Sequence, residues 1–158
     1  SNTINKYELI TETGHLKLDR VGYSSLAYPF AYGCIPKTWD EDGDPLDIEI
    51  VSVTEPLIPG SIVEARIIGV MKFDDGGEVD DKVIAVLSDD KRMEHIKSFE
   101  DLGPHWIKET TYYWEHYKDL KKPGTCKVNG FLGITEAIKV IEDCEDRYKK
   151  DIEPNLID

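Results

Sequence analysis

The pattern that most constrains the fold is a series of short predicted strands separated by turns. Two of these turns are rich in acidic residues. Ile48 to Val53 is typical of a strand that follows the acidic stretch 40–49, and Ile62 to Met71 predicts a longer β-branched strand. A second acidic turn, residues 74–81, leads into a predicted strand from Lys82 to Leu87. Several short strands with turn signals between them indicate a small closed barrel and argue against alternating β-α-β units.

The residues ahead of this pattern predict a β-hairpin and then an irregular segment. Lys6 to Thr11 and Leu16 to Leu18 alternate in polarity, and Thr13-Gly14 between them is typical of a turn. Residues Tyr23 to Trp39 contain aromatic residues, a glycine and two prolines. We therefore expect an ordered irregular loop there, without helix or strand.

The carboxyl-terminal third of the chain predicts two helices with a strand between them. Pro104 opens the first helix, which we expect to continue to about Leu120, and Thr125 to Phe131 is a plausible last strand. Thr135 is a candidate cap for the second helix. The expected apolar face of that helix consists of Ala137, Ile138, Ile141, Cys144 and Tyr148. We expect the tail, residues 151–158, to be frayed.

Length and composition favour one globular domain over residues 1–158. The chain is 40% hydrophobic and 32% charged, and no apolar run is long enough to cross a membrane. The chain shows no leader-like segment, and its three cysteines are widely spaced, so we expect a soluble protein of the reducing cytoplasm. A net charge of −13 argues against a nucleic-acid partner and is compatible with multivalent cations.

The acidic stretch 40–49 holds six carboxylates in ten residues, which repel one another unless they splay into water or hold cations. Gly43 and Pro45 shape the turn so that Asp42 and Asp44 project to similar sides, and Asp47 can converge on them. A sparse set of carboxylates that leaves room for water and phosphate suits Mg²⁺. A calcium-binding EF-hand is excluded because its loop requires glycine where this chain has Pro45. A solvated hairpin remains the alternative.

Cationic side chains that can hold phosphate are also present, near several tyrosines, although none of these residues is informative alone. They are Lys6, Arg20, Lys82 and Lys118, with Tyr28, Tyr32 and Tyr117.

The order of residues in the acidic motif indicates a protein family more specifically than its charge does. Residues 42–47, Asp-Gly-Asp-Pro-Leu-Asp, resemble the D-G-D-P-hydrophobic-D signature of the soluble family I inorganic pyrophosphatases. Further segments resemble that family in the same order: 6–8, 19–20, 28–29, 32–33, 59–60, 69–70, 80–82 and 115–120. The resemblance therefore covers nearly the whole chain.

The resemblance implies a mainly β (α+β) fold, an OB-like five-stranded closed β-barrel with flanking α-helices. It also implies hydrolysis of pyrophosphate to two orthophosphates with several Mg²⁺ ions, for which Mn²⁺ or Zn²⁺ are possible substitutes. The implied metal ligands are Asp42, Asp47, Asp75 and Asp80. Asp44 is implied as the general base that takes a proton from a metal-activated water. The implied phosphate-binding residues are Lys6, Arg20, Tyr32, Lys82, Tyr117 and Lys118.

Two departures from the family pattern concern metal binding. The family has an acidic residue where this chain has Gly76, so metal binding beside Asp75 is expected to be weaker or rearranged. The family also carries a strand with a metal-binding glutamate ahead of the segment that Lys6 matches, and we expect that strand to lie upstream of Ser1. Glu8 is a candidate to serve that metal site in part.

A third departure concerns assembly. Bacterial hexamers of the family carry a histidine pair on the long helix, whereas this chain has Tyr112 at one position and His116 at the other. We expect a homo-oligomer, with a hexamer as the favoured size.

Two other functions compete with pyrophosphate hydrolysis. The Gly76 substitution and the expected upstream strand leave open a non-catalytic, OB-like module that binds phosphate or metal. A barrel that binds nucleic acid is disfavoured by the negative charge. Within the acidic stretch, we expect Asp40, Glu41 and Glu49 to be dispensable for the chemistry.

Overall fold

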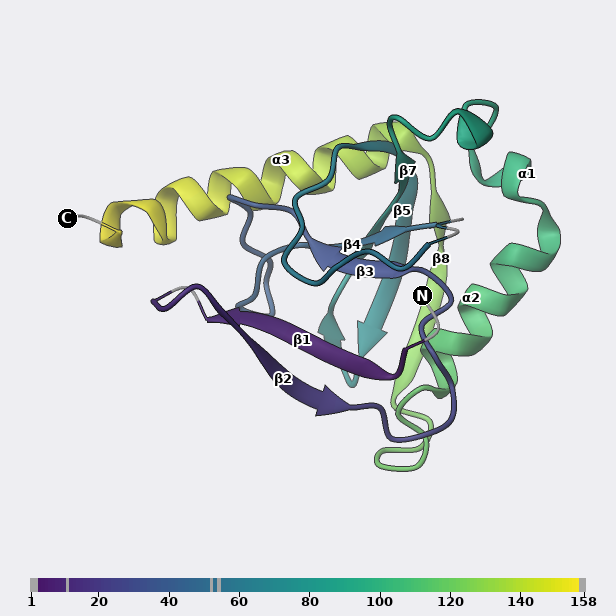
Figure 1. Cartoon of the computed structure of the whole chain (residues 1–158), viewed down its shortest axis with the longest axis horizontal. Helices are drawn as coiled ribbons and strands as arrows, with labels where there is room; N and C mark the ends of the chain where they lie inside the picture. The colour runs from purple at the N-terminus through teal and green to yellow at the C-terminus, as the bar shows by residue number, and fades with distance from the viewer. Residues whose placement is uncertain (1–2, 11, 52, 54, 157–158) are drawn as a thin grey trace.

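In the computed structural model, described for residues 3–10, 12–51, 53 and 55–156, the strands form two separate sheets (Figure 1). The smaller sheet is the hairpin of β1 (Asn5–Ile10) and β2 (His15–Val21), which pair antiparallel. Gly14 closes the turn with a positive φ of 70°, and its amide donates to the carbonyl of Ile10 at 2.8 Å. The predicted hairpin is confirmed, although Thr11 lies outside the described residues.

The larger sheet has six strands, five of them in the order β3-β4-β7-β5-β6, and β8 pairs with Val70 to Asp75 of the long strand β5. Its strands are β3 (Ala31–Cys34), β4 (Asp47–Ile50), β5 (Ala65–Asp75), β6 (Glu78–Val79), β7 (Lys82–Leu87) and β8 (Cys126–Leu132). Strands β4 and β7 are parallel, so Asp47 and Lys82 are register partners. This pairing brings the ends of the two acidic segments together.

The strand pairing of the described residues does not close into a ring, because β1 and β2 form no ladder with the larger sheet. The mainly β composition with helices is therefore confirmed, whereas the closed five-stranded barrel stays a prediction.

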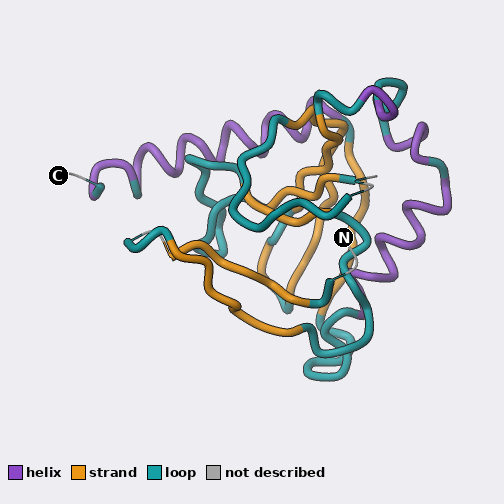
Figure 2. Tube along the Cα trace, in the orientation of Figure 1, coloured by secondary structure: helices purple, strands orange, loops and turns teal. Residues whose placement is uncertain are grey.

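Helices flank the larger sheet, as Figure 2 shows. They are α1 (Phe99–Leu102), α2 (Pro104–His116) and α3 (Ile134–Asp151), with short 3₁₀ helices over Lys91–Met93 and Glu153–Asn155. Helix α2 packs against β8, and α3 packs against β5. Of the helices in the described ranges, none is long and apolar enough to cross a membrane.

The main core lies between the larger sheet and α2 and is rich in aromatic rings. Phe30 and Trp114 stack with centroids 5.8 Å apart, and Phe73 contacts the same indole at 5.2 Å. A smaller core joins α3 to the sheet through Leu46, Cys144 and their neighbours. The acidic turn 40–47 is thus anchored to packed elements on both sides.

Gly69 of β5 is required by close packing. A Cβ atom there would lie 2.4 Å from the ring of Phe99 and 2.5 Å from the carbonyl oxygen of Leu132. The register of β5 against β7 also shifts between Ile67 and Gly69. This position therefore lets α1 and β8 approach the same stretch of β5.

Several element boundaries differ from the sequence predictions. The expected loop 23–39 contains strand β3, because pairing with β4 overrides the local glycine and proline signals. Helix α2 ends at His116, short of Leu120, and α3 begins at Ile134 with Gly133, and not Thr135, as its cap. A 3₁₀ turn occupies part of the tail expected to be frayed. Ser52, within a predicted strand, and residues 157–158 lie outside the described residues.

Candidate active site

One cavity of about 160 Å³ gathers charged and aromatic residues from widely separated positions between Lys6 and Lys118. Its lining consists of Lys6, Arg20, Tyr28, Tyr32, Asp42, Asp44, Asp47, Asp75, Asp80, Trp114, Tyr117 and Lys118. Ten of these were predicted from the sequence. The other two predicted residues, Lys82 and Glu8, are not part of the lining, but each forms a hydrogen bond with a residue that is.

The acidic turn places two carboxylates at the cavity through a local backbone motif. Gly43 has a φ of 85°, and the amide of Asp44 donates to Oδ1 of Asp42 at 3.0 Å. The amide of Asp40 donates to the carbonyl of Asp44 at 2.8 Å, which closes the turn. Burial, with the neighbouring carboxylates Asp40, Asp44 and Asp47, raises the pKa of Asp42 against the amide hydrogen bond that lowers it.

Lys82 connects the first acidic turn to the second beneath the cavity. Its ammonium group is completely buried, donates to Oδ2 of Asp47 at 2.6 Å and also donates to Oδ1 of Asp80. The phenol of Tyr32 donates to the same Oδ2 of Asp47. Although burial lowers the pKa of Lys82, the two carboxylates outweigh it and the net pKa is raised. Lys82 is therefore a fixed positive charge under two carboxylates.

The pKa values of Asp80 and Tyr32 are both raised by burial and by neighbouring carboxylates. Burial raises the pKa of Asp80 to about 6, with a further contribution from Asp47 and against the opposing charge of Lys82. Burial, and then the charges of Asp47 and Asp80, hold the pKa of Tyr32 well above its ordinary value. Tyr32 is thus a neutral hydrogen-bond donor at physiological pH.

Lys118 and Asp75 form a further ion pair in the lining of the cavity. The ammonium group of Lys118, just beyond the end of α2, donates to Oδ2 of Asp75 at the end of β5. Burial alone raises the pKa of Asp75, but the hydrogen bond and charge of Lys118 outweigh it, so the net pKa is lowered. Asp75 is therefore held in its ionised form.

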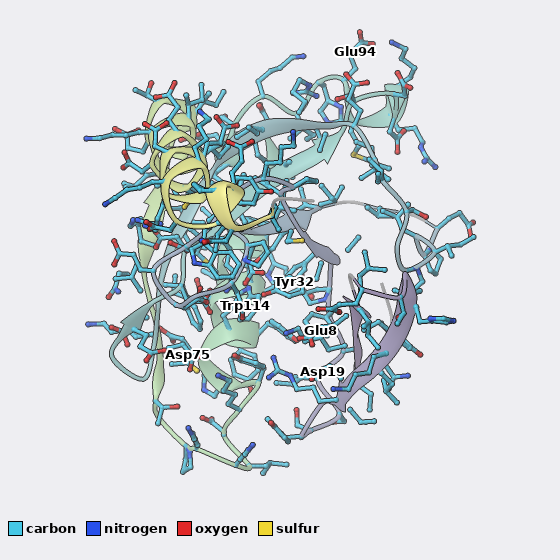
Figure 3. The ribbon with its side chains drawn as sticks, turned by 90° about the vertical axis from the view of Figure 1, so that its left-hand side faces the viewer. Glu8, Asp19, Tyr32, Asp75, Glu94 and Trp114 are labelled. Atoms are coloured by element: carbon cyan, nitrogen blue, oxygen red, sulfur yellow. The ribbon has the colours of Figure 1, made fainter. Side chains whose placement is uncertain are left out.

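The hairpin supplies the cationic wall of the cavity. Lys6 of β1 and Arg20 of β2 are register partners on adjacent strands and both reach the lining. Glu8 is two residues along β1, and its carboxylate accepts a 2.8 Å hydrogen bond from Lys6. Figure 3 shows Glu8 and Asp19 on the side of the hairpin and Tyr32, Trp114 and Asp75 together across from them. Glu8 as a metal ligand stays a prediction.

The chemistry of the lining suits a hard divalent cation, because five carboxylates converge on one cavity. No three Asp, Glu, His or Cys side chains of the described residues already surround a single point as metal ligands. The physical reason is that Lys82 and Lys118 hold Asp47, Asp80 and Asp75 in ion pairs. A bound cation would share these carboxylates with the two ammonium groups.

Comparisons with known proteins identify the family of the chain. The family model described as inorganic pyrophosphatase matches residues 1–149 of the chain. The chain belongs to the inorganic pyrophosphatase family. An inorganic pyrophosphatase of Neisseria meningitidis serogroup B is 45% identical over 147 residues, which cover 92% of this chain and 82% of the relative. A soluble inorganic pyrophosphatase of Zea mays is 42% identical, with 96% of this chain and 70% of the relative covered.

Solved structures of inorganic pyrophosphatases share the fold. The crystal structure from Neisseria gonorrhoeae superposes with a TM-score of 0.88 at 44% identity, covering 94% of this chain and 86% of that one. The structure from Thermus thermophilus gives a TM-score of 0.85 at 40% identity, covering 93% of this chain and 85% of that one.

Three residues of this pyrophosphatase-family site were not assigned to it from the sequence. Tyr28 and Trp114 line the cavity, and Glu49 lies fully buried with a 2.6 Å hydrogen bond from the indole N–H of Trp114. Trp114 stands three residues before Tyr117, so helical spacing alone could have placed both on one face. Glu49 was expected to be a dispensable charge. Burial raises its pKa to about 8, against the opposing effects of Trp114 and Lys82.

Proposed function

We propose that this chain hydrolyses inorganic pyrophosphate to two orthophosphates with Mg²⁺ as its cofactor. The single observation that carries the proposal is one cavity lined both by five carboxylates, the acidic wall, and by the cationic wall of Lys6 and Arg20. Pyrophosphate and divalent cations together carry charges that complement these two walls. The family membership established above supports the same reaction.

In this proposal, the acidic wall holds the metal ions. Asp42, Asp47 and Asp80 form one site, and Asp75 joins Asp80 at another. When bound, Mg²⁺ neutralises the substrate and acidifies water. Mn²⁺ and Zn²⁺ are candidate substitutes because they accept the same carboxylate oxygens.

Asp44 is proposed as the general base. It lines the cavity, and its carboxylate makes no hydrogen bond to any other described residue, so it is free to accept a proton from an attacking water. We place the phosphate groups in this cavity because five hydrogen-bond donors line it. These donors are Lys6, Arg20, Tyr32, Tyr117 and Lys118. They bind the phosphates and stabilise the charge that develops on the leaving group.

Lys82 has a different role in this proposal from the one expected at first. Its ammonium group is fully buried, and two of its three N–H donors are used by Asp47 and Asp80. We therefore assign Lys82 to holding the two carboxylates, with contact to phosphate only through them.

Three wider expectations belong to the same proposal. The family resemblance supports a closed barrel, a cytoplasmic location and a homo-oligomer, with a hexamer favoured. Tyr112 is 57% exposed and stacks on His116 with centroids 4.2 Å apart, which supports a contact surface on α2.

The proposal is tested by measuring phosphate release from pyrophosphate during an Mg²⁺ titration, beside calorimetric Mg²⁺ binding without substrate. Asp47→Asn should weaken Mg²⁺ binding and phosphate release together, because it removes a carboxylate from the acidic wall. Glu142→Gln, on the exposed side of α3, is the matched control and should change neither. Mg²⁺ binding without any phosphate release from the folded wild-type protein would instead identify the non-catalytic module.

A further inference from the structure

A buried carboxyl group lies under the proposed site without a role in the reaction. Glu49 is on β4, two residues after Asp47, so both side chains point to the same face of the strand. Its side chain is 0% exposed, and its neighbours in register are Tyr32 on β3 and Ile84 on β7. Placing a carboxyl group in such a core has a cost that an apolar residue would avoid.

Glu49 makes one strong contact, and this contact joins the sheet to α2. The indole N–H of Trp114 donates to Oε1 of Glu49 at 2.6 Å, across 65 residues of sequence. The other oxygen, Oε2, is buried and has no hydrogen-bond partner among the described residues. The hydrogen bond from Trp114 is therefore the one that the carboxyl group of Glu49 accepts among the described residues.

The indole ring in turn contacts the parts of the site that bear charge. The ammonium nitrogen of Lys82 lies 5.1 Å from the centroid of the Trp114 ring, within the range of a cation–π contact. The ring of Tyr117 meets the same indole at 5.0 Å, edge to face. A rotation of Trp114 would thus disturb both the lysine beneath the carboxylates and a tyrosine that lines the cavity.

We propose that Glu49 is a positioning residue that fixes Trp114 so that its ring holds Lys82 against Asp47 and Asp80. This inference rests on the proposed function, since it assigns Glu49 to the spacing of two proposed metal ligands. It acts through Trp114 and Lys82, and not through contact with metal or substrate. Outer partners of metal ligands commonly change metal affinity by about 10- to 100-fold.

The test compares four variants by calorimetric Mg²⁺ binding without substrate and by the indole N–H signals in NMR spectra. Glu49→Leu removes the acceptor and leaves the indole N–H unpaired, so Mg²⁺ affinity should fall about tenfold or more. Glu49→Gln keeps an acceptor oxygen and should restore most of that affinity. Trp114→Phe identifies the Trp114 signal by its loss, and that signal should move on Mg²⁺ addition to the wild-type protein.

The fourth variant separates positioning from simple destabilisation. In Glu49→Leu/Trp114→Phe no buried N–H lacks an acceptor, so stability should recover relative to Glu49→Leu while Mg²⁺ affinity stays low. If Glu49→Leu does not fold, this double variant and Glu49→Gln carry the comparison.

Two results would overturn the inference. One is unchanged Mg²⁺ affinity in folded Glu49→Leu or in the double variant, with wild-type phosphate release intact. The other is an indole N–H signal of Trp114 whose chemical shift does not change when Mg²⁺ is added to the wild-type protein. A wild-type protein that releases no phosphate would instead contradict the proposed function, so the two failures are distinguishable.

Discussion

The ammonium group of Lys82 donates a 2.6 Å hydrogen bond to Oδ2 of Asp47 across the parallel strands β7 and β4. Only 1% of the lysine side chain is exposed, whereas 22% of the Asp47 side chain reaches the surface of the cavity. One positive charge is therefore built into the fold beneath the carboxylates. It lets Asp47 and Asp80 approach each other without a metal ion.

Replacing this lysine should be costly. Lys82→Met is expected to lower the free energy of unfolding by about 3 to 5 kcal/mol without metal, because two partly buried carboxylates lose their partner. Mg²⁺ should restore part of the loss, because it binds the folded state at those carboxylates. Urea denaturation with chelator and with Mg²⁺ measures both effects. Lys108→Met, on an exposed part of α2, is the control, and an equal loss there would contradict this explanation.

Helix α3 anchors the acidic turn through Arg147. Its guanidinium donates to the carbonyl oxygen of Trp39 at 2.6 Å and lies 3.6 Å from Oδ1 of the buried Asp40. Arg147→Ala should lower the free energy of unfolding by about 1.5 to 3 kcal/mol, since a hydrogen bond from a charged donor is lost. The matched control is Lys149→Ala, whose exposed pair with Asp146 should contribute less than about 0.5 kcal/mol. Denaturation of both variants in guanidinium chloride measures the two losses of unfolding free energy. Equal losses in the two variants would refute the anchoring role.

The three thiols should differ in reactivity. Cys34 is exposed, whereas Cys126 and Cys144 are buried. Burial, with the charge of Asp40, raises the pKa of Cys144 to about 12, so its reactive thiolate stays scarce below that pH. Iodoacetamide should therefore modify one thiol of the native protein, and raising the pH from about 7 to 9 should speed that reaction without adding Cys144. Mass spectrometry of the peptides measures this, and early labelling of Cys144 would contradict the burial described.

The sequence predicted which residues line the cavity better than it predicted the bounds of the strands and helices. Strand β7 was predicted at its exact bounds because its residues are β-branched and an acidic turn precedes it. Strand β3 was missed because its residues, Ala-Tyr-Gly-Cys, have little strand preference and form a strand by pairing with β4. Local patterns report local preferences, and this pairing is a long-range contact.

The burial of Glu49 was not predicted, for a similar reason. In the sequence it is one of six acidic residues in a polar stretch, and nothing nearby indicates that Trp114, 65 residues away, supplies its hydrogen bond. The structure shows Asp40 in a related position, buried against Cys144 and Arg147. Two of the three acidic residues expected to be dispensable for the chemistry are therefore buried, and their dispensability stays a prediction.

The central claim is that Asp44 moves the proton in pyrophosphate hydrolysis, and a matched pair of variants tests it most directly. Initial phosphate release at saturating Mg²⁺ should fall about 10²-fold or more in Asp44→Asn, whose side chain cannot accept the proton as a carboxylate does. Glu41→Gln, three residues earlier on an exposed side chain, should keep most of the wild-type rate. Circular dichroism would confirm that both variants remain folded. Equal losses in the two variants, or a wild-type rate in Asp44→Asn, would contradict the assignment.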